Sequence, residues 1–122
     1  MNSNILKKLF INYCDKNKFD KNVNQIKIIE LLSSFYLKKK NILDFILKKK
    51  IKLAFYLYGN VGVGKTMVLN FFYNNLEVNK LRIHFNEFML NFHDYRHKFK
   101  NENDSIEKYV KELKKKYRII YL

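Results

Sequence analysis

The chain has 122 residues, of which 25 are lysine or arginine and 11 are acidic, so its formal net charge is +14. This length corresponds to about one small domain, so a second complete domain is not expected. Hydrophobic residues make up 48% of the chain and aromatic residues 16%, which excludes a disordered protein and predicts a folded α/β or α region.

The arginine and cysteine content narrows which binding partners and which cellular compartment are expected. Arginine occurs only at positions 82, 96 and 118, whereas base readout and bidentate phosphate contacts favour arginine over lysine. Abundant lysine without proline is typical of an AT-rich coding sequence, so no specific nucleic-acid partner is predicted. No apolar run reaches the roughly 18 residues of a membrane span, which leaves only peripheral membrane association open. The single cysteine, Cys14, excludes an intramolecular disulfide and favours a reducing compartment.

The first part of the chain reads as helical. Residues 5–14 are predicted to form a short helix, and Asn24 to Lys38 a longer one. Lysine runs at 38–40 and 48–50 predict solvated turns, with one or two helical turns at 42–47 between them. The apolar face of the longer helix is expected to hold Ile28, Leu31, Leu32, Phe35 and Tyr36.

The middle of the chain reads as strand, loop and helix. Leu53 to Tyr58 is continuously apolar and ends at a glycine, as in a strand buried on both faces of a parallel sheet. A helix is predicted from Thr66 onward. The stripe expected to pack on the sheet consists of Leu69, Phe72, Tyr73 and Leu76.

Three further elements are predicted toward the C-terminus. Residues 82–85 alternate and favour a strand, which a helix over 89–99 follows. Asp104 or Ser105 is expected to cap another helix that ends in lysines 114–116, the charge order that the helix dipole favours. Residues 117–122 are predicted to form a third, apolar strand.

The segment that carries chemistry lies between the first strand and its helix. It fits the pattern G-x-x-x-x-G-K-[ST] and contains all three glycines of the chain: Gly59, Asn60, Val61, Gly62, Val63, Gly64, Lys65 and Thr66. Such a loop turns its amide groups toward a phosphate, and glycine permits the backbone angles that this needs. Lys65 is then placed to reach the β- and γ-phosphates, and the Thr66 hydroxyl to bind Mg²⁺. A turn that merely joins a strand to a helix would not explain lysine and threonine at the last two positions.

Around this loop the sequence resembles the ZapE-like ATPases, known in mitochondria as AFG-one-like or LACE-type ATPases and related to the AAA+ superfamily. The resemblance rests on three blocks and, less specifically, on Gln25, which is similar to the glutamine of the family's N-terminal D-x-x-Q segment. In chain order the blocks are YLYGNVGVGKTMVLNFFYNNL, RIHFNEFMLNFH and YRIIYL. Two positions depart from the family pattern: Val63 stands where arginine is usual, and Asn86 where a second histidine is usual.

The resemblance implies an AAA+-like P-loop NTPase, an α/β three-layer sandwich with a parallel sheet. Residues 1–50 would form an N-terminal helical segment, and 51–122 the first part of the ATPase domain, ending at the Walker B strand. The Walker B acidic pair would follow Leu122, so a truncated or partial product is expected, with weak hydrolysis, an incomplete sheet and open strand edges.

The resemblance also implies ATP and Mg²⁺ as ligands and Lys65 and Thr66 as catalytic residues. It suggests a role in bacterial cell division with a division-ring protein as partner, in the cytoplasm. The alternative is protein quality control in the mitochondrial matrix, and an oligomer stays open. Two other readings are a helicase-loader type of P-loop ATPase and a basic nucleic-acid or membrane-surface binder with an inactive loop.

The remaining polar candidates favour plainer interpretations. His93 and His97 are four residues apart on a predicted helix, and His84 would be a third metal ligand, but neither an H-E-x-x-H order nor a cysteine cluster accompanies them. Glu87 is interpreted as a helix-starting residue. Gln25 either approaches the adenine or faces solvent, and Cys14 is expected to be a half-buried packing residue.

Overall fold

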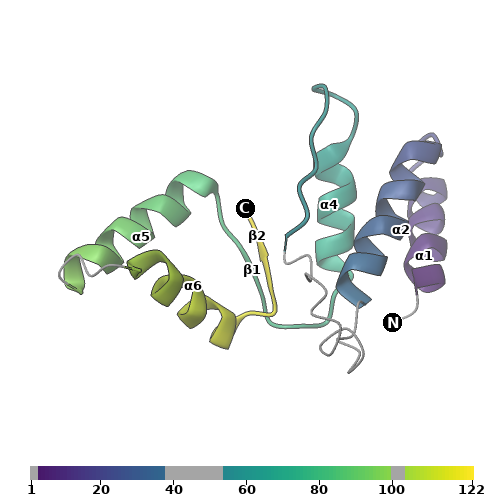
Figure 1. Cartoon of the computed structure of the whole chain (residues 1–122). Helices are drawn as coiled ribbons and strands as arrows, with labels where there is room; N and C mark the ends of the chain where they lie inside the picture. The colour runs from purple at the N-terminus through teal and green to yellow at the C-terminus, as the bar shows by residue number, and fades with distance from the viewer. Residues whose placement is uncertain (1–2, 38–53, 100–103) are drawn as a thin grey trace, which may run out of the picture. The chain divides into compact units, whose positions relative to one another are not determined.

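The computed structural model describes residues 3–37, 54–99 and 104–122, and the chain divides into two compact units, Met1–Leu76 and Glu77–Leu122. The described helices of the first unit are α1 (Ser3–Lys16), α2 (Val23–Leu37) and α4 (Lys65–Asn74), shown in Figure 1. The turns expected at 38–40 and 48–50 and the helical turns expected at 42–47 lie outside the described residues. The first two predicted helices and the helix after the loop are confirmed.

The core of the first unit is built where the three helices meet. Phe71 of α4 meets two rings of α1: its centroid is 5.0 Å from that of Phe10, edge to face, and 5.2 Å from that of Tyr13. Such ring pairs add to the free energy gained by burying apolar area. Fully buried apolar side chains from all three helices complete the core: Leu6, Phe10, Ile29 and Val68.

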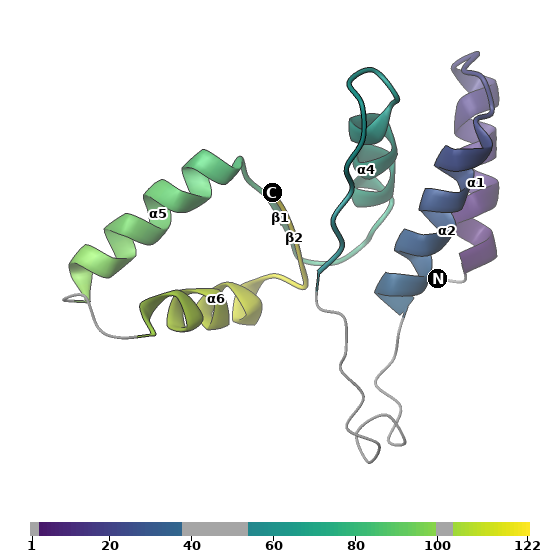
Figure 2. The ribbon, with the colours of Figure 1, turned by 45° about the horizontal axis from the view of Figure 1, so that its top comes forward.

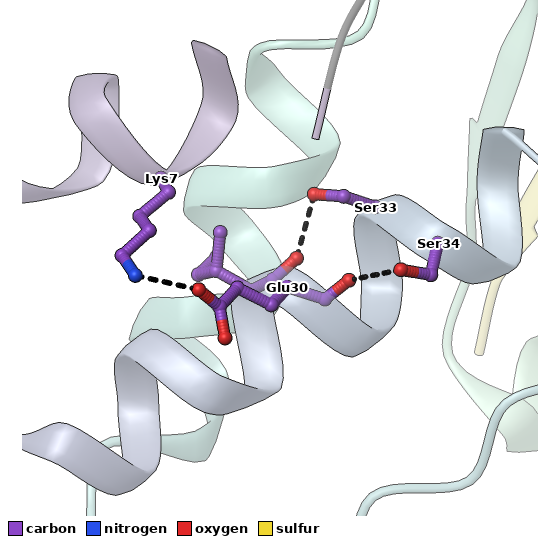
Figure 3. A network of polar contacts seen from close by, with 5 residues as sticks. Lys7, Glu30, Ser33 and Ser34 are labelled. Carbon is purple, nitrogen blue, oxygen red and sulfur yellow. Dashed lines mark hydrogen bonds and ion pairs between the residues drawn. The ribbon is translucent and has the colours of Figure 1, made fainter. Parts of the chain in front are cut away.

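Figure 3 shows one ion pair that joins α2 to α1 and two hydrogen bonds within α2. The Lys7 ammonium lies 2.6 Å from a Glu30 carboxylate oxygen and joins the two helices. Within α2, the hydroxyl of the buried Ser33 donates to the Ile29 carbonyl at 2.6 Å, and the Ser34 hydroxyl donates to the Glu30 carbonyl at 2.9 Å. The Ser33 bond matters because a buried hydroxyl without a partner would destabilise the fold.

Cys14 is buried in this core rather than half-buried, with 1% of its surface exposed. Burial, and secondarily the neighbouring Asp15 carboxylate, raises the pKa of the Cys14 thiol. Because the reactive form of cysteine is the thiolate, the thiol is suited to packing and protected from reagents in the folded unit.

The strand predicted at residues 53–58 does not form in its described part. Residues 54–58 have no strand assignment, and Tyr56 and Tyr58 are 85% and 80% exposed. Phe55 and Leu57 alternate with them and are partly buried, and the Phe55 ring lies 5.9 Å from that of Phe35 on α2. The side-chain alternation of a strand is therefore present. The ladder is absent because no described segment pairs with this one, and a strand exists only with hydrogen-bonded neighbours.

The packing face of α4 also differs from the prediction. Val68 and Phe71 of α4 are buried in addition to the predicted Phe72 and Leu76, the last of which lies beyond the end of the helix. The helix packs on α1 and α2 instead of on a sheet. Leu69 and Tyr73, expected on the buried stripe, are only partly buried. On α2, the expected apolar residue Leu31 is exposed.

The second unit contains a small parallel sheet. Strand β1 (Lys80–Arg82) pairs with β2 (Ile119–Tyr121) in the register Lys80↔Ile119, Leu81↔Ile120 and Arg82↔Tyr121. Two further backbone bonds extend the pairing: Ile83 N–H to Tyr121 O at 3.0 Å, and Arg118 N–H to Asn79 O at 2.7 Å. The mixed helix-and-strand class and the parallel pairing agree with the sequence prediction.

Helices α5 (Phe85–Lys98) and α6 (Ser105–Lys116) connect these strands, as Figures 1 and 2 show. Tyr109 of α6 packs among rings of α5, with centroid distances of 5.5 Å to Phe88, 5.8 Å to Phe92 and 5.2 Å to Tyr95. Burial there raises the pKa of the Tyr109 phenol. The aromatic cluster holds the two helices together.

Element boundaries in this unit differ from the prediction at two places. The strand expected at 82–85 lies at 80–82, and α5 begins at Phe85 instead of near Met89, because the extended residue His84 (φ −70°, ψ 143°) occupies the N-cap position. Glu87 lies in the first turn of α5, as expected of a helix-starting residue. Asp104 precedes α6 in a left-handed conformation (φ 67°) and makes no side-chain cap bond, so capping there does not follow the predicted chemistry.

Candidate functional site

The glycine loop turns over the start of α4. In Figures 1 and 2 the segment after residue 54 runs beside α4 and the loop reverses the chain into the helix, which begins at Lys65. Gly62 and Gly64 have φ values of 83° and 78°, in the left-handed region that strains other residues. The predicted loop-to-helix arrangement is therefore observed, although the segment before it is not a paired strand.

Lys65 places its ammonium group inside the loop. Its Nζ donates to the Gly59 carbonyl at 2.8 Å and to the Asn60 carbonyl. These acceptors are neutral carbonyls at the opposite end of the loop, and no acidic group is hydrogen-bonded to Lys65 in the described residues. An anion entering the loop could therefore replace two neutral partners with a charged one, which forms the stronger hydrogen bond.

The first turn of α4 begins with a positively charged side chain. Helix N-termini favour acidic side chains, because the dipole and the free amides are positive there. The first turn of α4 contains no acidic residue and starts with Lys65. The helix is otherwise regular from its start, since the Gly64 carbonyl accepts the Val68 amide at 3.1 Å. Positive charge on a positive helix end is what an anion site requires and what stability alone would disfavour.

A cavity of about 250 Å³ lies beside this turn, between α2, the end of segment 54–58 and the loop. It is slightly smaller than the roughly 300–1,000 Å³ of a pocket for a whole drug-sized ligand, so it suits part of a nucleotide. Lys65 is the one charged residue among the side chains that line it: Asn22, Asn24, Gln25, Ile28, Leu57, Tyr58, Gly59, Asn60, Val63, Lys65 and Val68.

The other residues of the motif lie at the surface. Thr66 is exposed in the first turn of α4, and Asn60, Val61 and Val63 are exposed in the loop. Side chains that point to solvent leave the backbone of the loop as the part that can contact a ligand. The prediction that the loop acts through its amides, Lys65 and the Thr66 hydroxyl is compatible with this geometry.

Gln25 lies against the loop, and not simply in solvent. From the first turn of α2 its Nε2 donates to the Val63 carbonyl at 3.1 Å. The other lining residues from this part of the chain, Asn22 before α2 and Asn24 and Ile28 within it, were not predicted as site residues. The signal available in the sequence for Ile28 was its spacing from Gln25, since residues three apart fall on one side of a helix.

The histidines lie away from this site in the sequence and are not brought together as ligands. His84 is exposed at the N-cap of α5, and His93 and His97 are exposed on that helix. In the described residues, no group of three or more histidine, cysteine or acidic side chains could hold a metal ion.

A second, larger hollow of about 650 Å³ lies between α1 and α4. Its lining is mainly apolar and amide side chains, with Lys16 as the one charged residue, and it includes none of the glycine-loop residues. Cavity size alone therefore does not identify the site, because the predicted loop residues line the smaller cavity.

With this geometry established, comparison with known proteins decides the family. A family model described as AFG1-like ATPase matches residues 12–122. The chain belongs to this family. The resemblance found in the sequence blocks is thereby confirmed over nearly the whole chain.

Two curated relatives share part of this AFG1-like ATPase chain. Lactation elevated protein 1 homolog B of Danio rerio is 53% identical over 48 residues, which cover 38% of this chain and 10% of the relative. Uncharacterized protein C115.02c of Schizosaccharomyces pombe is 49% identical over 45 residues, which cover 34% of this chain and 10% of the relative. The aligned region is thus about a tenth of each relative's length. No solved structure matches the chain.

Both departures from the family pattern are exposed in this AFG1-like ATPase chain. Val63 lies in the loop and contributes its carbonyl to Gln25, and Asn86 lies in the first turn of α5. Neither side chain is needed for packing. Among the described helices, none combines the length and apolar character required to cross a bilayer.

Proposed function

We propose that this chain binds the phosphates of Mg-ATP through residues 59–66, and that the complete protein hydrolyses ATP. The observation that carries the proposal is the charge arrangement around the loop. Lys65 donates hydrogen bonds to two neutral carbonyls and starts a helix without first-turn acids. It lies beside a cavity that no carboxylate lines in the part of the chain that the structure describes. An anion with several oxygens is the ligand that satisfies these donors together.

Each part of the loop has a distinct task in this proposal. The loop amides and the first amides of α4 would donate hydrogen bonds to the phosphate oxygens, and Lys65 would leave the Gly59 and Asn60 carbonyls to reach the β- and γ-phosphates. The Thr66 hydroxyl would be the ligand that this loop provides for Mg²⁺. When bound, Mg²⁺ supplies charge neutralisation on the phosphates. Lys65 and Thr66 are accordingly the proposed catalytic residues of this chain.

The proposed fold is the AAA+-like P-loop sandwich, with residues 1–50 as its N-terminal helical segment and 51–122 as the start of the ATPase domain. The parallel pairing of β1 with β2 through helices α5 and α6 supports it, because α/β nucleotide-binding folds are built from such crossovers. In this fold β2 takes the position of the Walker B strand, at which acidic residues would complete the hydrolytic site.

The cellular role stays a prediction from the resemblance to ZapE-like ATPases. It comprises cell division with a division-ring protein as partner, in the cytoplasm, or protein quality control in the mitochondrial matrix. A helicase-loader type of ATPase and a basic nucleic-acid binder are the alternatives. The exposed lysines of α6 give the last alternative its charge, so salt dependence discriminates it.

The test is titration of a fluorescent ATP analogue, with and without Mg²⁺, at several salt concentrations. Lys65→Ala should weaken binding roughly 10- to 150-fold, because a hydrogen bond to a charged group contributes about 1.5–3 kcal/mol. Lys8→Ala is the matched control, since it removes the same charge from an exposed position on α1. Thr66→Ala should reduce the benefit of Mg²⁺ while leaving metal-free binding nearly unchanged.

Two results would contradict the proposal. In the first, the unmodified chain binds no nucleotide. In the second, Lys65→Ala and Lys8→Ala lose the same small amount of affinity and binding disappears with salt. The second result would favour nonspecific attraction to a lysine-rich surface.

A further inference from the structure

The contact between Gln25 and the loop joins positions 38 residues apart in the sequence. Gln25 is the third residue of α2 and is partly buried against the loop. Its Nε2 donates to the carbonyl of Val63, the residue that precedes Gly64. This bond fixes one peptide group of a loop that, in the proposed function, binds phosphate through its backbone amides.

Contacts of α2 hold the backbone of Gln25 in place. Asn22 caps α2: its side-chain oxygen accepts the Asn24 amide at 2.8 Å, and its carbonyl accepts the Ile26 amide at 3.1 Å. The ion pair between Lys7 and Glu30 holds the same helix on α1. Gln25 therefore projects from a fixed first turn, since side-chain oxygens at the N-cap stabilise helix starts.

The bond determines how the peptide between Val63 and Gly64 is oriented. This peptide is trans, as are the other described peptides, so its C=O and N–H groups point in opposite directions. A Val63 carbonyl held by Gln25 directs the Gly64 N–H to the side away from Gln25. Rotation of the peptide would reverse both groups, and glycine at position 64 makes such rotation easy. The rotated peptide would point the Val63 carbonyl oxygen, instead of the Gly64 N–H, toward a bound phosphate.

A side chain at position 64 would also push Gln25 away from the loop. A Cβ atom built on Gly64 would lie 2.4 Å from the Gln25 Nε2, whereas one on Gly62 would meet no atom within 4 Å. Both glycines have positive φ. Alanine at 64 would therefore displace the Gln25 amide in addition to straining the backbone, and alanine at 62 would cause strain alone.

We infer that Gln25 is a positioning residue for phosphate binding, which acts by holding the Val63–Gly64 peptide with its N–H group available to the anion. It acts through Gly64 and does not itself touch the phosphates. The inference rests on the proposed function in one respect only, namely that the anion is the phosphate chain of a nucleotide. The effect on the loop is present without any ligand.

The three glycines give a direct measurement. A chain labelled with ¹⁵N-glycine yields three backbone amide signals, all from the loop, because Gly59, Gly62 and Gly64 are its only glycines. Assignment follows from the signal lost in Gly62→Ala and in Gly64→Ala. In Gln25→Met, which keeps the length of the side chain and a good helix former but removes the donor, the Gly64 signal should move or broaden most.

Binding is measured on the same samples with inorganic triphosphate and with Mg-ATP. Gln25→Met should lower the affinity for triphosphate and for Mg-ATP about 5- to 10-fold, which corresponds to the loss of one neutral hydrogen bond. The thermal midpoint should stay within about 2 °C of the parent, since a change at a partly exposed site is small. Ser34→Ala, exposed on the same helix, should leave signals and affinity unchanged.

A double-variant cycle separates positioning from general damage. In the Gly64→Ala background Gln25 is already displaced, so adding Gln25→Met should cost little further affinity. In the Gly62→Ala background the 5- to 10-fold penalty should remain. Equal penalties in both backgrounds, or an unmoved Gly64 signal in Gln25→Met, would overturn the inference. If the parent chain binds no nucleotide, the proposed function fails, while the Gly64 signal still tests whether Gln25 orients the loop.

Discussion

Two short apolar segments of this chain have similar composition, but only one of them forms a strand. Residues 54–58, Ala-Phe-Tyr-Leu-Tyr, precede the glycine loop and carry no strand assignment, whereas Ile119–Tyr121 forms β2. Both are rich in strand-favouring residues. The difference is the partner: β2 pairs with β1 over three positions, and no described segment pairs with 54–58. Strand propensity describes how well a side chain fits a sheet that already exists.

The two units are consequently stabilised in different ways. The first unit depends on packing of α1, α2 and α4 around Phe71, and segment 54–58 contributes only Phe55 and Leu57 as partly buried residues. The second unit combines the strand ladder with the ring cluster around Tyr109. Among the described residues, the glycine loop is therefore held by helices and not by a sheet. Variants that weaken helix packing test this.

The largest expected effect is on the core of the first unit. Phe71→Ala should destabilise this unit by about 3–5 kcal/mol, because it removes a buried ring that contacts both Phe10 and Tyr13. Tyr56→Ala should change stability by less than about 0.5 kcal/mol, since Tyr56 is largely exposed. The contrast isolates helix packing from any contribution of segment 54–58.

Cys14 provides a measurement confined to the first unit. It is the only cysteine and is buried there, so its rate of reaction with a thiol reagent reports opening of that unit. Phe71→Ala should accelerate the reaction by about two to four orders of magnitude, and Tyr56→Ala by less than about threefold. Equal acceleration by the two variants would mean that segment 54–58 is as important to the fold as the helix core.

The next effect is local and concerns hydrogen exchange of backbone amides. The amides of Ile83 and Arg118 donate to carbonyls across the strand pair, whereas no such bond is present for 55–58 among the described residues. We expect exchange at least about tenfold slower, or about 1.4 kcal/mol, at Ile83 and Arg118 than at 55–58 after correction for intrinsic rates. Equal protection would show that 54–58 has a ladder partner after all.

The sequence predicted the local elements better than their partners. The helices at α1 and α2 and the loop-to-helix turn at Lys65 follow from short-range signals: apolar spacing and glycine at positions with positive φ. The strand at 53–58 was wrong in its described part because a ladder depends on distant residues. The stripe predicted after Thr66 was right for Phe72 and Leu76, which are buried. It missed Phe71, which faces α1 through tertiary packing that the spacing does not show.

The candidate site divides in the same manner. The loop residues 59–66 could be predicted because the motif is contiguous and its glycines have a stated backbone role. The bond from Gln25 to Val63 could not, since it spans 38 residues and depends on how α2 lies on the loop. The resemblance to the family singled out Gln25, but spacing alone could not distinguish a solvent-facing glutamine from one that orients the loop.

The smallest expected effect concerns the ion pairs in each unit. Lys7 and Glu30 join α1 to α2 at 2.6 Å with both side chains about 40% exposed, whereas Lys111 and Glu107 are 4.0 Å apart on α6 and about 70% exposed. A double-mutant cycle with alanine should give a coupling of about 0.2–1 kcal/mol for the first pair and at most about 0.5 kcal/mol for the second. Cys14 reactivity measures the first coupling and exchange of α6 amides the second. Both should shrink in roughly 1 M salt, because solvent screens exposed charges. A first coupling that is zero at low salt would mean that apolar packing alone positions α2, and with it Gln25, against the loop.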